Sequence, residues 1–140
     1  MQAIATWRKG REILLEDGRA HAVVVDLRPE DGGTSAGTTP LELSLLSLAG
    51  SLTSTFVSVA RKRRLDVSGL SLVLEEEATS ASAPVGAVRG SLRVRSRSER
   101  AEVDATLQSS LEQCPVSRLF REAHIPLNVL AIVSGTTRVS

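Results

Sequence analysis

The sequence has few aromatic residues, a single cysteine and almost no excess of charge. Only Trp7, Phe56 and Phe120 are aromatic among 140 residues, so the core must be built from Leu, Val, Ile and Ala. Cys114 is the only cysteine, which excludes a disulfide within one chain. Basic residues number 17 and acidic residues 16, so the charge balance does not indicate a nucleic-acid partner. No targeting pattern is evident, and we expect a reducing, cytoplasmic location.

The stretch from Pro40 to Arg64 predicts one long helix. Before the four cations at 61–64 it carries a single charge, Glu42. Apolar or small residues lie on every side of its helical wheel, which is typical of a helix without a solvent-facing side. Proline suits the first helical turn, and the cations suit the negative end of the helix dipole. This segment is therefore expected to lie at the centre of the fold.

A helix of about 20 apolar residues is also long enough to cross a bilayer. Five serines, two threonines and Glu42 within it favour a protein interior instead. We therefore expect no membrane partner. A small chain has little surface with which to enclose a whole helix, so the pattern favours a second copy of the chain as the other cover.

Alternating apolar residues predict strands on both sides of this helix. They fall in the ranges 3–8, 12–16, 20–27, 67–77, 91–98 and 127–133. Helical spacing predicts two shorter helices, at 101–113 and 115–123. The order β-β-β-α-β-β-α-α-β predicts an α+β fold with antiparallel sheet. We expect a single domain over 1–140 with three parts, a β-meander at 1–28, the helix at 40–64 and a β/α part at 66–140.

Two polar segments resemble anion sites but favour other interpretations. The Gly/Ser/Thr loop at 29–39 lacks the Lys-Ser/Thr ending of a phosphate-binding loop, so phosphate binding is not expected. Arg93, Arg95 and Arg97 alternate along a predicted strand. We expect them to face the glutamates of the preceding strand in a solvated ladder rather than nucleic acid. The loop between these two strands is predicted at 78–90.

Cys114 is the strongest candidate for chemistry, with two interpretations open. It directly precedes Pro115, at the N-cap of a new helix, where backbone amides lower a thiol pKa. Arg118 would reach back over the same turn and assist. The alternative is a small buried hydrophobic residue that completes an apolar stripe. That stripe contains Val103, Leu107 and Leu111.

No metal or cofactor is expected. His21 and His124 could join Cys114 as ligands, but their spacings match no zinc pattern. A Ser-His-Asp arrangement is also weak, since Ser51 lies in the middle of a helix rather than on an exposed elbow. A Gly-rich dinucleotide fingerprint is absent from the sequence.

Two segments together resemble the OsmC/Ohr family of peroxide-stress proteins. The first is VVVDLRPEDGGTSAGTTPLELSLLSLAGS, which is similar to the family's strand, glycine loop and central helix. The second is EQCPVSRLFREAHIPLNV, which is similar to its C-terminal CPVS signature. The resemblance implies an intertwined homodimer, in which antiparallel sheets wrap two long central helices. It also implies reduction of organic hydroperoxides at the expense of a dithiol reductant.

The resemblance further assigns roles to residues, with departures. It implies that Cys114 is the second, resolving cysteine, while the first, peroxidatic position falls on Ser51, which cannot form a thiolate. It places a supporting arginine at Arg11 and a supporting glutamate at Leu41, with Glu42 one residue later. The implied function is an OsmC-like stress and redox protein whose peroxidase activity is reduced, dependent on one cysteine, or lost. The alternative is a non-catalytic protein that holds a small hydrophobic molecule between its subunits.

Overall fold

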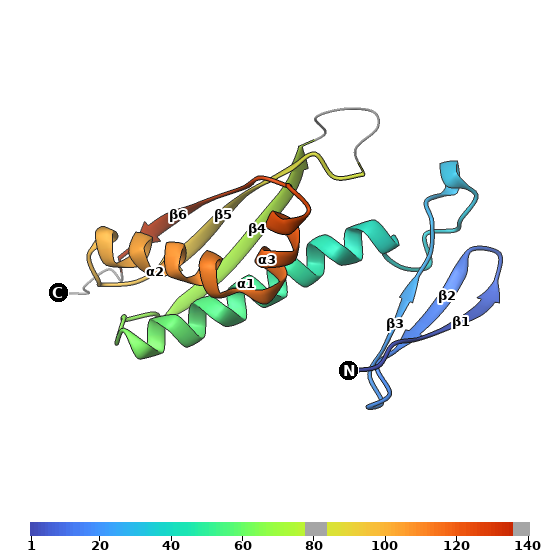
Figure 1. The fold of residues 1–140 in the computed structure, drawn as a ribbon, viewed down its shortest axis with the longest axis horizontal. Coiled ribbons are helices and arrows are strands. Elements are labelled where there is room, and N and C mark those ends of the chain that lie inside the picture. Colours follow the sequence, from blue (N-terminus) through green and yellow to red (C-terminus); the bar gives the residue numbers. More distant parts are fainter. Residues whose placement is uncertain (78–83, 136–140) are drawn as a thin grey trace. The chain divides into compact units, whose positions relative to one another are not determined.

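The fold was analysed in a computed structural model that describes residues 1–77 and 84–135. The chain divides into two compact units, residues 1–46 and 47–140, and each is described by itself. Figure 1 gives the element labels. The predicted loop at 78–90 lies partly outside the described residues.

The N-terminal unit contains the predicted meander (Figure 1). Strands β1 (Ile4–Lys9), β2 (Glu12–Glu16) and β3 (Ala22–Val25) form an antiparallel sheet in that order. Its two turns contain Gly10 and Gly18, both at positive φ, where L side chains are strained. The third strand ends at Val25, two residues earlier than expected, because Asp26 turns the chain into the glycine loop.

Asp26 organises the glycine loop, which includes a short 3-10 helix, η1 (Pro29–Asp31). Its buried carboxylate accepts hydrogen bonds from the amides of Leu27, Thr34 and Ala36 and from the Thr34 hydroxyl. The bonds from Ala36 and Thr34 are the main causes that lower the pKa of Asp26 to about 2. Glycine is required at position 33, since a Cβ there would overlap the carbonyl of Leu27. The loop amides therefore bind the carboxylate of Asp26, an anion of the chain itself. This explains the glycine-rich sequence without a bound phosphate.

Helix α1 (Pro40–Lys62) begins as predicted and ends two residues early. Thr39 and Glu42 form a reciprocal pair at its start, since each side chain accepts a hydrogen bond from the other residue's amide. At its end Arg64 adopts positive φ. By length and hydropathy alone, α1 is long and apolar enough to cross a membrane, as core helices of soluble proteins also are.

The single chain buries only one stripe of α1. That stripe contains Leu48, Leu52, Phe56, Val59 and Ala60. Leu46, on another side of the helix, is 57% exposed. The uncovered apolar surface is what the predicted second copy would have to cover.

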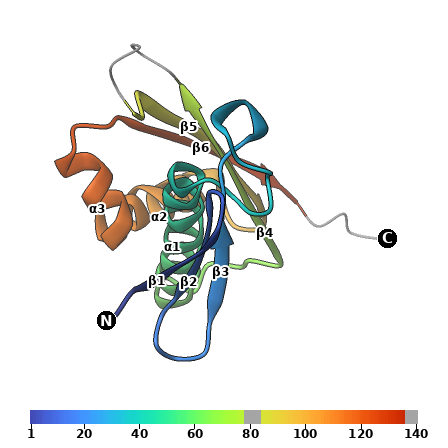
Figure 2. The same cartoon turned by 90° about the vertical axis from the view of Figure 1, so that its right-hand side faces the viewer.

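The C-terminal unit is a three-stranded sheet with helices on one face (Figures 1 and 2). Strand β4 (Gly69–Glu77) pairs antiparallel with β5 (Ala87–Arg95), and β5 pairs parallel with β6 (Leu127–Ser134). The α+β class is as predicted, but the predicted antiparallel pairing is wrong for β5 and β6. The two helices between β5 and β6 return the chain to the starting end of β5, which makes the pairing parallel.

The second strand of this sheet begins at Ala87, whereas the sequence predicted a loop as far as residue 90. Gly90 accounts for this difference. Glycine is common in loops, but here it lies in the middle of β5. A Cβ at this position would lie 2.7 Å from the carbonyl oxygen of Val73 on β4. Glycine here permits close approach of the two strands.

Helices α2 (Arg100–Gln113) and α3 (Pro115–Glu122) follow β5. The core joins Leu52 and Phe56 of α1, Leu92 of β5, and Val103 and Leu107 of α2. Leu119 of α3 is 64% exposed and does not pack with this core. Helix α3 is short, and Phe120 and Ser117 occupy its buried side instead.

Candidate functional site

Cys114 joins two helices. It is the C-cap of α2, where its amide donates to the carbonyl of Ser110, and it is also the N-cap of α3. Its side chain is fully buried. Pro115 has no amide hydrogen to continue α2, so the sequence Cys-Pro produces the break at which the thiol is held.

Ser51, in the middle of α1, contacts this thiol. Its Oγ lies 3.1 Å from the Sγ of Cys114, although the two residues are 63 positions apart. Ser51 is half-buried, while the sulfur has no exposed surface. The structure therefore brings these two residues together within a single chain.

Hydrogen bonds around the sulfur offset the effect of its burial. Burial raises the pKa of the Cys114 thiol, whereas the hydroxyls of Ser117 and Ser51 and the amides of Ser117 and Val116 lower it. The lowering contributions prevail, so the pKa lies below its ordinary value. The amide of Ser117 donates to Sγ at 3.4 Å. The Ser117 hydroxyl is buried without a hydrogen-bond partner among the described residues, so it can turn toward an ionised sulfur.

Arg118 does not assist this thiol, contrary to the sequence prediction. Its Nε donates to Glu122 Oε1 at 2.9 Å, on the exposed side of α3. Residues four apart lie on the same face of a helix, so the carboxylate of Glu122 is nearer to the Arg118 guanidinium than the thiol at the start of α3 is. Neutral hydroxyls and amides therefore stabilise the thiolate.

Glu42 is held by Arg28 rather than by Arg11. Nη2 of Arg28 donates to Glu42 Oε1 at 2.6 Å, and the amide of Thr39 donates to Oε2 at 2.9 Å. The bond from Arg28 is the largest cause that lowers the pKa of Glu42 to about 2. Sequence reasoning missed Arg28, which faces Glu42 only because the glycine loop folds back.

Arg11 lies exposed in the turn between β1 and β2. Arg11 and Glu42 both belong to the N-terminal unit, and no salt bridge joins them among the described residues. Catalytic roles for Arg11 and Glu42 stay predictions.

The histidines do not form a metal site in the part of the chain that the structure describes. His21 Nδ1 pairs with Asp17 Oδ2 at 2.8 Å in the second turn of the meander. His124 lies just after the end of α3 and has a positive φ. Residues 1–77 and 84–135 contain no group of three His, Cys, Asp or Glu that could hold a metal ion.

The arrangement suits thiol chemistry with one sulfur. A thiolate at a helix N-cap is a nucleophile and can be oxidised to a sulfenic acid. Ser51 can donate a hydrogen bond to the sulfur but cannot form a disulfide with it. Complete burial of Sγ means that a reactant needs a local opening at this helix junction.

A family model matches most of this chain. The model of the OsmC-like protein family matches residues 32–129, a range that contains Glu42, Ser51 and Cys114. A search of curated proteins finds no match.

Solved structures share the fold. An OsmC-like protein from Mycoplasma pneumoniae has a TM-score of 0.83 and 15% identity, and the match covers 94% of this chain and 95% of that one. A Legionella pneumophila organic hydroperoxide resistance protein, OsmC, has a TM-score of 0.67 and 20% identity, with coverage of 96% and 97%. A Vibrio cholerae structure, named for organic hydroperoxide resistance and with captopril in one of its active sites, has a TM-score of 0.63 and 18% identity, with coverage of 98% and 92%. With the family match over residues 32–129, the chain belongs to the OsmC-like protein family.

Proposed function

We propose that this protein is a redox protein that reduces organic hydroperoxides slowly, with Cys114 as its only reacting thiol. The observation that carries the proposal is the contact between Ser51 Oγ and Cys114 Sγ at 3.1 Å, beside the first amides of α3. This contact supplies hydrogen bonds to the thiolate while leaving it without a second thiol. Neighbours in fold are named for organic hydroperoxide resistance, which supports the substrate class.

The cycle needs two external thiols for each peroxide. The Cys114 thiolate attacks one peroxide oxygen, the S–O bond forms, the O–O bond breaks, and the alkoxide takes a proton to leave as an alcohol. An external thiol then attacks the sulfenic sulfur, forms a mixed disulfide and releases water. A second external thiol cleaves the mixed disulfide, becomes oxidised and returns Cys114 to the thiol.

Ser51 would act in this cycle through its hydroxyl. It donates to the thiolate and helps to keep the pKa of Cys114 low. It cannot condense with the sulfenic acid, so resolution depends on diffusion of a reductant to a buried sulfur. Slow turnover is the expected consequence.

The proposed active form is a homodimer in the cytoplasm. The uncovered apolar surface of α1, with Leu46 57% exposed, supports a second chain as its cover. Sedimentation is expected to give twice the chain mass of 14.9 kDa. A stable monomer at micromolar concentration would contradict this proposal.

Complete burial of the Cys114 sulfur favours a second candidate function. A sulfur that no reactant reaches would be structural, and the same fold would then hold a small hydrophobic molecule between its subunits without catalysis. The measurement that separates the two functions is consumption of cumene hydroperoxide in the presence of dithiothreitol.

The test compares the unaltered protein with Cys114→Ser and with Ser54→Ala, a control on an exposed side of α1. We expect slow, dithiothreitol-dependent consumption that Cys114→Ser abolishes and Ser54→Ala leaves unchanged. Mass spectrometry after addition of dimedone is expected to find the adduct at Cys114. No consumption above background, or activity that survives Cys114→Ser, would refute the peroxidase proposal.

A further inference from the structure

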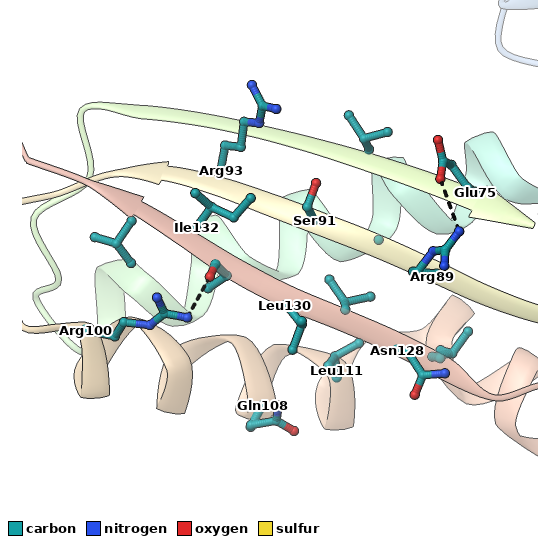
Figure 3. Close-up of a pocket in the computed structure, with 16 residues that line it drawn as sticks. Glu75, Arg89, Ser91, Arg93, Arg100, Gln108, Leu111, Asn128, Leu130 and Ile132 are labelled. Atoms are coloured by element: carbon teal, nitrogen blue, oxygen red, sulfur yellow. Dashed lines mark hydrogen bonds and ion pairs between the residues drawn. The ribbon is translucent and has the colours of Figure 1, made fainter.

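An open groove lies on the outer face of the β4–β5–β6 sheet and extends over the edge of β6 to α2, whose Arg100, Gln108 and Leu111 also line it (Figure 3). It has a volume of about 940 Å³ and is floored by all three strands. Alternation along the strands directs one set of side chains to the core and the other set to this face. Neither Ser51 nor Cys114 lines the groove, so it is separate from the site described above.

Large apolar side chains are exposed along the groove. Leu130 is 72% exposed, Val73 52% and Ile132 48%. Ser91 pairs with Val73 on one side and Leu130 on the other, and Ile132 follows Leu130 on the same face of β6. They form one row across the sheet rather than scattered positions, and such rows mark binding surfaces.

Two arginines lie at one end of this row without a described acidic partner. The strand register places Ser71 and Ile132 beside Arg93, and Gly69 and Ser134 beside Arg95. In residues 1–77 and 84–135, no salt bridge joins either arginine to a carboxylate. The predicted pairing of Arg93 and Arg95 with glutamates is therefore wrong, and the glutamates of β4 pair instead with Arg89, whose Nη1 lies 2.7 Å from Glu77 Oε1.

A second, smaller hollow lies between these arginines. It measures about 250 Å³, and its lining includes Arg93, Arg95, Ser71 and Ser134. Two guanidinium groups and two hydroxyls supply hydrogen-bond donors, and guanidinium geometry suits a carboxylate in particular. Arg93 lines both hollows, so the cationic end and the apolar row are continuous.

We propose that this face binds a free, single-chain amphiphile with a carboxylate head. The head lies between Arg93 and Arg95, with the hydroxyls of Ser71 and Ser134 as further donors. The chain lies over Ile132, Leu130 and Val73. A neutral amphiphile would leave the two guanidinium groups without a partner, and a small anion would leave the apolar row exposed, so neither matches both ends of the groove.

The test measures decanoate binding to the full chain by titration calorimetry, below the micelle concentration of the probe. We expect one saturable site per chain, weakened by added salt. Arg93→Gln and Arg95→Gln should each weaken binding about tenfold, because each removes a charge-assisted hydrogen bond. Arg97→Gln is the matched control, since Arg97 pairs with Asp66 and lines neither hollow, and should leave the affinity unchanged.

Other arms test each end of the groove. Decanol, which lacks the charge, and acetate, which lacks the chain, should both bind much more weakly than decanoate. Ser71→Asp places a carboxylate in the small hollow and should abolish binding, and it provides an independent variant if an arginine variant does not fold. Circular dichroism establishes that each variant is folded.

Several results would overturn the proposal. These are the absence of saturable decanoate binding, equal affinity in folded Arg93→Gln, or equal affinity for decanol. Co-sedimentation with phosphatidylglycerol vesicles that decanoate does not displace would instead identify a membrane surface as the partner. A failure of the peroxidase assay leaves all these readouts unaffected, because decanoate binding needs no thiol.

Discussion

Replacement of Ser51 by cysteine tests the geometry of the thiol site most directly. The Ser51 Oγ lies 3.1 Å from the Cys114 Sγ, and a disulfide needs about 2.05 Å between sulfurs. The longer C–S bond of cysteine and a movement of about 1 Å would close this gap. We therefore expect Ser51→Cys to form a disulfide with Cys114 under mild oxidation, without rearrangement of α1 or α3.

The expected gain in stability follows from the loop that this bond closes. For positions 63 apart, loss of chain entropy in the unfolded state corresponds to at most about 4 kcal/mol. Strain in the native state reduces this value, so we expect about 2–4 kcal/mol. For a chain of this size, that free energy raises the melting temperature by about 5–15 °C.

The assay combines free-thiol counting, intact mass and thermal unfolding with and without dithiothreitol. Ser54→Cys is the control, since position 54 lies three residues further along α1 on an exposed side. It should retain both thiols and show no dithiothreitol-sensitive melting temperature. The oxidised Ser51→Cys protein should run as a single chain on a non-reducing gel, which distinguishes this bond from one between chains.

Failure of Ser51→Cys to lose free thiols, or equal oxidation of Ser54→Cys, would refute the geometry. Formation of the disulfide with faster, dithiol-dependent reduction of cumene hydroperoxide would support both the site and the proposed function. Formation of the disulfide without that activity would retain the geometry and favour the binding alternative.

Three further predictions concern the thiol pKa, the core and the acid limit of stability. Alkylation of Cys114 by iodoacetamide should show a pH midpoint below the usual thiol pKa of about 8.5, because hydroxyls and amides stabilise the thiolate; a midpoint above it would contradict this. Phe56→Ala should lower the free energy of unfolding in urea by about 3–5 kcal/mol, because Phe56 is fully buried. Leu119→Ala, at an exposed position, should change it by less than about 1 kcal/mol. Similar losses in both variants would contradict the core assignment. The pKa of Asp26 is about 2 in the folded chain and 3.8 ordinarily, so its contribution to stability is present above about pH 4 and is lost as the pH falls toward 2. Acid unfolding of Asp26→Asn should lack this component. An unchanged pH dependence of the unfolding free energy in this variant would contradict the prediction.

Local pattern was sufficient for much of the fold. Thr39, directly before Pro40, and Glu42 are start signals for this helix, so the beginning of α1 was predictable from neighbouring residues. Period-two alternation placed the inward side chains of β4 and β5 correctly. The order Cys-Pro located the junction of α2 and α3, because proline interrupts one helix and suits the start of the next.

The candidate site was predictable only in part. The resemblance placed Ser51 opposite Cys114, and the structure brings them together. It did not indicate Ser117, whose amide and hydroxyl lie beside the sulfur, or Arg28, which holds Glu42. These contacts depend on how a helix turn and a loop are placed in space, and spacing along the sequence does not encode that placement.

Pairing between distant strands was decided by tertiary structure alone. Alternating apolar residues predicted the strand at 127–133, but its parallel direction follows from the two-helix crossover before it. Gly90 suggested a loop until its close approach to Val73 showed why a strand needs glycine there. The register also decided which arginines meet carboxylates, since Arg89 lies opposite Glu75 while Arg93 lies opposite Ser71. Residues far apart in the chain become neighbours through a register that local propensity does not specify, so only the tertiary structure could show them.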